Sequence, residues 1–205
     1  FSISAIPVRE ALRQLESEGW IKGELNKGAT VAPLNANEAR EIYEIRASLE
    51  SLALACAIPA HTPTTLREAK LLYDAARSET DPTLYVLRNE AFHLCLYAPA
   101  HRPQLTELIV TLHRRGERYL RLKLGFADHK AVSDREHAAL LRAVRRGDVS
   151  TAQKLITEHL LDTGALLHTL LNESESERDT DPERASSADL GKARASGSAP
   201  KSRRA

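Results

Sequence analysis

Apolar residues recur at the three- and four-residue spacing of amphipathic helices through most of the chain after residue 35. One clear stripe comprises Leu105, Leu108, Ile109 and Leu112. Proline and glycine fall mainly between such stripes, where they end helices. The pattern predicts helices at about residues 36–58, 63–78, 82–98, 102–125, 132–146 and 149–171. We therefore expect a mainly α protein whose largest part is an all-helical bundle of six or seven antiparallel helices.

Two of these helix starts carry capping sequences. Asp81 supplies an N-cap acceptor ahead of Pro82, and proline suits the first position of a helix. Ser133 and Glu136 have the spacing of a capping box, so a helix is expected to begin at Ser133.

The N-terminal part of the chain follows a different pattern. Residues 4–19 predict one short amphipathic helix that stops at a glycine. Residues 20–24 and 29–32 are short β-prone runs on either side of Asn26-Lys27-Gly28, which favours a hairpin turn. A helix followed by a hairpin is typical of the second half of a winged helix-turn-helix, although other small α+β units share this order.

These changes of pattern divide the chain into three parts. Residues 1–34 are expected to form the partial winged helix-turn-helix, residues 35–171 the helical domain, and residues 172–205 a tail. The tail is polar and has almost no large apolar side chains, so burial cannot offset its ordering entropy and we expect it to be disordered. Because the chain starts inside the first pattern, we also expect a further segment upstream.

Composition narrows the class of protein. The chain is 42% hydrophobic and has a formal net charge of +1. No apolar run reaches the roughly 20 residues that span a bilayer, and the first residues lack a secretory signal pattern. We therefore expect a cytoplasmic protein with no membrane partner. Cys56 and Cys95 lie within apolar helical patterns and are expected to be buried, reduced thiols.

Four polar residues lie on the sides of the predicted helices that are expected to face the core. Asn89 and His93 are four apart and share one helix face, while His137 and His159 lie beside the apolar stripes of two later helices. Each histidine alone is explained as a hydrogen-bonded core residue. One oxygen and three imidazole nitrogens together instead predict a divalent transition-metal site with open coordination positions. Zinc is the first choice of metal, with manganese and nickel as alternatives.

Arg46 lies one turn from Ile42 and Leu49, so its guanidinium is expected to point partly into the bundle. A buried cation needs an anionic partner. Two interpretations therefore stay open. Arg46 forms a salt bridge with an acid of the same bundle, or it grips a small organic acid.

The N-terminal pattern resembles part of a known family. GntR transcriptional regulators have a recognition helix similar to the run Pro7-Val8-Arg9-Glu10-Ala11-Leu12-Arg13-Gln14-Leu15-Glu16 with Glu18-Gly19. Their wing is similar to residues 26–34, and the opening helix of the FadR-type FCD ligand-binding domain resembles residues 43–50. The resemblance runs from about residue 3 to 171. It predicts a GntR regulator of the FadR-type subfamily that is truncated at its N-terminus.

The resemblance implies roles for the polar residues of the helical domain. In FCD domains an Asp or Asn, a Phe-His pair and two later histidines hold a divalent metal, and the matching residues here are Asn89, His93, His137 and His159. Arg46 matches an arginine that helps to hold small carboxylate effectors. Asn89 replaces the commoner Asp and offers a neutral oxygen.

The resemblance also implies contacts with operator DNA. By position these would come from Ser4, Arg9, Arg13 and Lys27, mostly to phosphates. The family usually has Ser-Arg-Thr before Pro-Val-Arg-Glu, whereas this chain has Ser4-Ala5-Ile6. One basic DNA contact is therefore missing.

The predicted function is a repressor that binds operator DNA as a homodimer and releases it when a small carboxylate enters the helical domain. No catalytic residue is expected. Two alternatives use the same three histidines. One is a metal-dependent enzyme with Glu136 or Glu158 as its base, and the other is a sensor of the metal itself.

Overall fold

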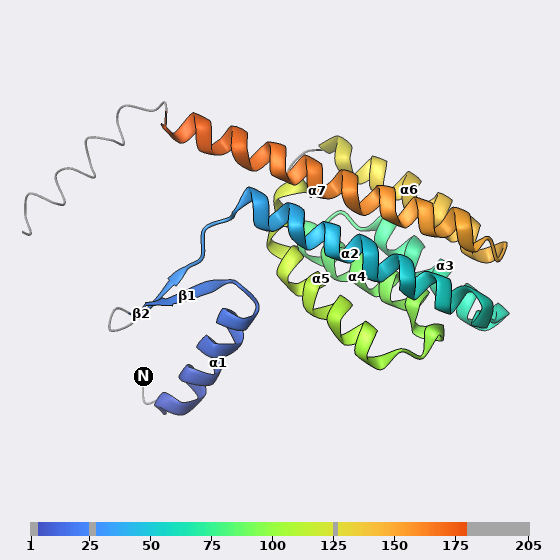
Figure 1. Cartoon of the computed structure of the whole chain (residues 1–205), viewed down its shortest axis with the longest axis horizontal. Coiled ribbons are helices and arrows are strands. Elements are labelled where there is room, and N and C mark those ends of the chain that lie inside the picture. The colour runs from blue at the N-terminus through green and yellow to red at the C-terminus, as the bar shows by residue number, and fades with distance from the viewer. Residues whose placement is uncertain (1–3, 25–27, 125–126, 180–205) are drawn as a thin grey trace, which may run out of the picture.

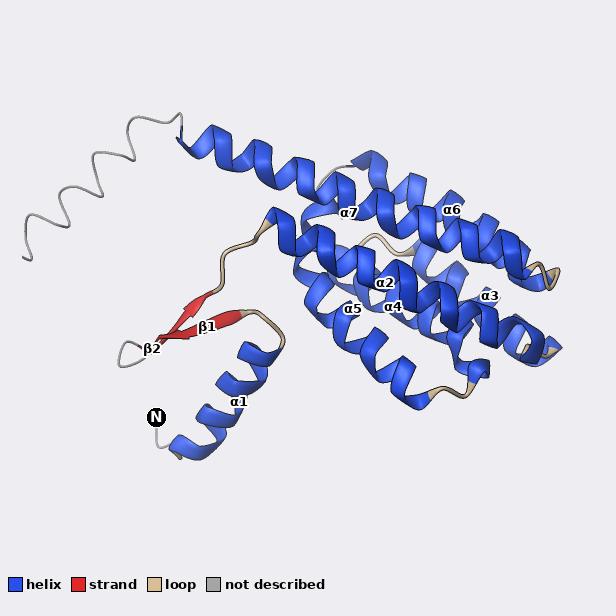
Figure 2. Cartoon of the chain, viewed as in Figure 1, coloured by secondary structure: helices blue, strands red, loops and turns tan. Residues whose placement is uncertain are grey.

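The computed structural model describes residues 4–24, 28–124 and 127–179. These ranges contain seven α-helices and one two-stranded sheet, which confirms the predicted mainly α fold. The elements are α1 (Ala5–Ser17), β1 (Ile21–Glu24), β2 (Gly28–Val31), α2 (Ala36–Ala57), α3 (Pro63–Ser78), α4 (Pro82–Tyr97), α5 (Pro103–Leu124), α6 (Ala127–Arg145) and α7 (Val149–Asp179). Helices α2 to α7 gather in one bundle, with α1 and the hairpin beside it (Figures 1 and 2). No helix within these ranges has the length and apolarity that a bilayer crossing requires.

The long helices α2 and α7 lie side by side in the bundle (Figure 1). Their close approach depends on Gly164 of α7, where an added Cβ atom would come within 2.9 Å of the Tyr43 Cβ atom on α2. The surrounding core includes the fully buried Leu54, Phe92 and Ile156. Burying each such side chain contributes about 1.5–3 kcal/mol. The bundle core is therefore continuous around the buried polar residues described below.

The N-terminal unit is small and leaves its apolar side chains largely exposed. Ser4 caps α1, and Gly19 follows the helix with a φ of +78°, a conformation that favours glycine. The hairpin is antiparallel and pairs Ile21 with Val31. None of the α1 residues is buried, and Ile6 is 69% exposed. Its attachment to the bundle therefore depends on a few polar contacts.

Arg118 of α5 provides the clearest of these contacts. Its guanidinium donates hydrogen bonds to the carbonyl oxygens of Gly19, which precedes β1, and Ala32, which follows β2. The bond to Ala32 is 2.6 Å long. On the same helix, Tyr119 donates a 2.8 Å hydrogen bond to Glu38 near the start of α2. Arg118 thus connects α5 to both ends of the hairpin.

The predicted start of α6 and the predicted end of α7 are wrong. Each of the other predicted helix ends lies within two residues of the observed one. Helix α6 begins at Ala127 and not at Ser133, which is buried inside it. Residues 127–132 contain no Gly or Pro, so the helix passes through the serine instead of starting on it. Helix α7 continues past residue 171 to Asp179 for the same reason. The rest of the tail that was expected to be disordered lies outside the described residues.

Candidate metal centre

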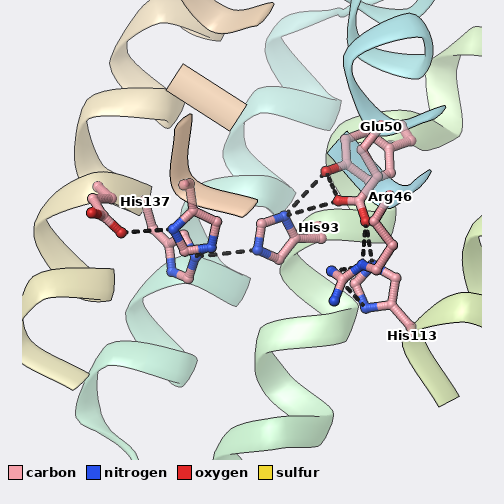
Figure 3. Close-up of polar contacts among 8 residues, drawn as sticks. Arg46, Glu50, His93, His113 and His137 are labelled. Carbon is pink, nitrogen blue, oxygen red and sulfur yellow. Dashed lines mark hydrogen bonds and ion pairs between the residues drawn. The ribbon is translucent and has the colours of Figure 1, made fainter. Parts of the chain in front are cut away.

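Three histidines from three different helices meet inside the bundle. His93 comes from α4, His137 from α6 and His159 from α7, and their exposed fractions are 0%, 2% and 9%. The His137 Nε2 atom lies 3.1 Å from His93 Nε2 and 3.3 Å from His159 Nε2. Figure 3 shows the rings of His93 and His137 directed toward each other. The structure thus brings together the three histidines that the sequence singled out.

The tautomer of His93 follows from its other ring nitrogen. Its Nδ1 atom lies 3.1 Å from the Tyr97 hydroxyl, which donates its own hydrogen to Glu50 Oε2 at 2.6 Å. Because that hydroxyl hydrogen is used, the contact with His93 requires Nδ1–H to be the donor. Burial holds the pKa of His93 well below its ordinary value, so the ring is neutral. Its Nε2 atom therefore carries a lone pair that points into the centre.

His159 is arranged in the same way by a different carboxylate. Its Nδ1 atom lies 2.7 Å from Glu136 Oε2, which accepts the Nδ1 hydrogen and leaves the lone pair on Nε2. A carboxylate behind a ligating histidine is the usual means of fixing its tautomer in metal sites. Glu158, the other glutamate considered as a base, has a side chain that is 55% exposed and lies 3.8 Å from Lys154. The two glutamates thus have different surroundings.

Hydrogen bonds alone do not account for the three Nε2 atoms. The Nε2 atom of a neutral imidazole carries either one hydrogen or one lone pair, so His137 Nε2 donates to at most one of its two neighbours. The observed spacing instead suits ligands of one ion. Nitrogens bound at 2.0–2.1 Å around a tetrahedral zinc are about 3.3 Å apart. The donor set and its spacing therefore fit a divalent transition metal.

Asn89 lies one turn before His93 on α4 and is 7% exposed. It lines a small cavity beside the histidines, together with His93, His159 and Arg46. The volume of this cavity is about 20 Å³. The structure thus places Asn89 in the wall of a cavity that two of the three histidines also line.

Arg46 is buried and forms a salt bridge on its own helix. Its Nε atom lies 2.7 Å from Glu50 Oε1, and its Nη2 atom lies 3.0 Å from His113 Nε2 (Figure 3). Burial by itself would raise the pKa of Glu50, but Arg46 and His113 outweigh it and hold that pKa well below its ordinary value. Of the two interpretations for Arg46, the ion pair is present, and Arg46 also lines the cavity.

Sequence reasoning missed three members of this network. Glu50 and Tyr97 each lie four residues after a residue that was singled out, Arg46 and His93 respectively. That spacing was the available signal, because residues four apart share a helix face. His113 gave no such signal, although it is only 7% exposed and contacts Arg46.

The residues proposed to contact DNA are mostly on the exposed N-terminal unit. Ser4 accepts a hydrogen bond from the Ile6 backbone nitrogen at 3.4 Å and so caps α1. Arg9 and Arg13 are exposed on this helix, and Arg13 pairs with Glu10 at 3.2 Å. Lys27 lies outside the described residues.

The fold defines a class of two-part proteins, in which a helix and a hairpin precede a helical bundle with a buried histidine centre. Comparison with known families identifies the family of this chain. The family model for the FCD domain matches residues 41–162. The chain belongs to the GntR family of transcriptional regulators, as a member of the FadR-type subfamily with an FCD domain. This confirms the family that the sequence motifs predicted.

Individual relatives agree with this assignment. The HTH-type transcriptional regulator YdhC of Bacillus subtilis is 29% identical, over 78% of this chain and 73% of the relative. The HTH-type transcriptional repressor GlaR of Escherichia coli is 28% identical, over 78% of each chain. A GntR family regulator from Pseudomonas syringae has a solved structure with a TM-score of 0.63 and 32% identity, covering 87% of this chain and 75% of that one. Escherichia coli McbR/YncC shares the fold, with a TM-score of 0.70 at 24% identity over 83% of this chain and 87% of that one.

Proposed function

We propose that this regulator is a cytoplasmic, metal-dependent repressor that senses a small organic acid. It binds operator DNA as a homodimer through Ser4, Arg9, Arg13 and Lys27, and it releases the DNA when the acid enters the bundle. The observation that carries the proposal is the convergence of three histidines, in which His137 Nε2 lies within hydrogen-bonding distance of the other two Nε2 atoms and all the ligand atoms lie within 4.8 Å of one another. Sensing is the simplest role for such a centre in the core of a DNA-binding regulator.

In this proposal His93, His137 and His159 hold the metal, with the Asn89 side-chain oxygen as a fourth donor. Zinc is the first choice, and manganese and nickel also suit imidazole and oxygen ligands. When bound, the ion supplies a Lewis-acidic position that attracts a carboxylate oxygen. The protein contributes neutral, pre-oriented imidazoles, since Tyr97 and Glu136 fix two of the three tautomers.

An enzyme that uses the same histidines would need a base free to act on a metal-bound water. Glu136 is instead hydrogen bonded to the Nδ1 atom of His159, and Glu158 pairs with Lys154 at the surface. Each of the two glutamates thus has another partner. This arrangement favours a sensor over an enzyme.

Helix α5 offers a route from the sensing centre to the DNA-binding unit. His113 on this helix contacts Arg46 and Glu50 inside the bundle. Further along the same helix, Arg118 holds both ends of the hairpin. A ligand that displaces Arg46 or His113 would therefore shift α5 and the hydrogen bonds of Arg118. Such small shifts of packed helices are a common means of switching.

The proposal is tested by calorimetry with the zinc-loaded protein. Acetate, lactate and succinate are titrated into the zinc-loaded chain and into the same chain after zinc is removed with a chelator. We expect saturable, zinc-dependent binding of at least one acid without product formation. Turnover of the acid would indicate the enzyme instead, and the absence of binding by any acid would contradict acid sensing.

The coupling through α5 makes a separate prediction for Arg118. The chain's single tryptophan, Trp20, directly follows Gly19, so its fluorescence anisotropy reports on this joint. Arg118→Ala should lower the anisotropy of Trp20 and abolish its response to the acid, because two hydrogen bonds to the hairpin are lost. Zinc content and acid affinity should stay near those of the wild type.

Arg114→Ala is the matched control, since Arg114 is an exposed arginine on the same helix. It should leave both the anisotropy and its response unchanged. If Arg118→Ala still shows the full response of Trp20 to the acid, the proposed route through α5 is wrong.

A further inference from the structure

A second cavity lies between α6 and α7, two helices that pack against each other (Figure 1). Its wall includes Val132 and Glu136 of α6 and His159 and Asp162 of α7. Val132 is 38% exposed and Asp162 is also exposed, so this outer cavity opens at the protein surface. His159 is the most exposed of the three histidines of the centre. The outer cavity therefore leads from solvent to one of the proposed metal ligands.

The outer cavity is larger than the cavity that Asn89 and Arg46 line, which we call the inner cavity. The two volumes are about 70 Å³ and about 20 Å³. A single water needs roughly 10–15 Å³, so the outer cavity has room for several waters and the inner cavity for about one. His159 and Thr163, one turn apart on α7, line both cavities. An ion that arrives with part of its hydration shell thus fits on the outer side of His159 and not on the inner side.

Charge also favours the approach of a cation from the outer side. The outer cavity carries the carboxylates of Asp162 and Glu136, and the imidazole of His129 lies in the same wall. The inner cavity instead carries the guanidinium of Arg46. A cleft lined by one sign of charge raises the local concentration of the opposite ion and speeds its association. The outer cavity is therefore the side that attracts a divalent cation.

The residues of the outer cavity do not form a second metal site. In the described part of the chain, the three histidines of the centre are the only group of three or more such side chains whose ligand atoms converge closely enough for an ion. Glu136 moreover accepts the Nδ1 hydrogen of His159 at 2.7 Å, which ties it to the centre. The outer cavity is thus arranged to attract a cation without retaining it.

On the basis of the proposed metal centre, we infer that the ion enters and leaves the centre through the outer cavity. Asp162 attracts the ion at the surface, and Val132 sets the width of the passage beside His159. These two residues control how fast the metal exchanges, whereas the histidines determine its affinity. The rate of metal loading is thereby a property that the chain sets separately from the centre itself.

Val132→Phe tests the passage, because the larger side chain fills part of the outer cavity and removes no proposed ligand. Zinc release into an excess of a chromophoric chelator is followed in time, and competition with the same chelator gives the equilibrium affinity. Release should slow by at least about fivefold, because extra atoms in a packed passage raise the barrier to transit. Affinity should stay within about twofold of the wild type, since a barrier slows uptake and release alike.

Leu161→Phe is the matched control, since Leu161 is a 42% exposed residue of α7 that does not line the outer cavity. It should leave both the release rate and the affinity unchanged. Release of zinc from Val132→Phe at the wild-type rate would overturn the passage.

Asp162→Asn tests the attraction of the cation. At low ionic strength zinc uptake should slow by about fivefold, and the difference from the wild type should shrink as salt screens the charge. Glu158→Gln is the matched control, because Glu158 is a surface carboxylate next to His159 that lies outside the cavity wall. Equal uptake rates in the two variants would overturn the role of Asp162.

The same measurements separate this inference from the proposed centre. Wild-type protein that binds no zinc would contradict the centre, and the passage with it. Tight zinc binding with unchanged exchange rates in both Val132→Phe and Asp162→Asn would overturn the passage alone.

Discussion

His159→Ala is expected to lower the zinc affinity of this regulator by at least about a hundredfold. Substitutions of residues that merely orient a metal ligand cost about 10–100-fold, so loss of a ligand should cost more. His159 is the most exposed of the three histidines at 9%, which makes it the substitution least harmful to the core. The helix should remain intact, because alanine is the best helix former.

The matched control is His168→Ala on the same helix. His168 is partly buried, and it contacts Asn172 at 3.3 Å and not the centre. Zinc affinity is measured by competition with a chromophoric chelator for both variants. We expect His168→Ala to match the wild type. Equal zinc affinity in the two variants would contradict the proposed centre.

Glu50→Ala should cause the largest loss of stability among the substitutions considered. Removing one partner of a buried ion pair costs about 3–5 kcal/mol, because the other charge is left without compensation. Here the uncompensated charge is on Arg46, and Tyr97 loses the acceptor of its hydroxyl hydrogen. For a chain of this size the melting temperature should fall by about 6–20 °C.

Helix α2 supplies its own control for this prediction. Arg40 and Glu44 form an ion pair with the same four-residue spacing, but both side chains are more than half exposed. Glu44→Ala should cost less than about 1 kcal/mol, since exposed pairs contribute little. Chemical unfolding of the zinc-free variants measures both changes. Similar losses for the two variants would show that the buried pair does not stabilise the fold as argued.

Much of the helical architecture could be predicted from the sequence, because periodic apolar positions are a local signal. Asp81 with Pro82 correctly marks the start of α4. The capping motif at Ser133 predicted a wrong start for α6, because the motif is defined only by the spacing of two residue types. Whether it acts as a cap depends on the residues before it, and those continue the helix. Local motifs therefore fix helix ends less reliably than apolar periodicity fixes helices.

The candidate site was predictable only in part. His93, His137 and His159 stand beside apolar stripes, and this position indicated that they face inward. For Glu50 the only signal was its four-residue spacing from Arg46, and His113 gave none, since charged and polar residues usually lie at the surface. The burial of Tyr43 against Gly164 of α7 is likewise a property of tertiary packing, which no single-helix pattern reveals.

X-ray absorption at the zinc edge tests whether three histidine nitrogens of this chain hold one metal ion. The protein loaded with one equivalent of zinc should show only nitrogen and oxygen neighbours at about 2.0–2.1 Å, with the outer-shell scattering of three imidazoles. Sulfur neighbours at about 2.3 Å would instead place zinc on Cys56 or Cys95. That result, or a spectrum with fewer than three imidazoles, would contradict the proposed centre.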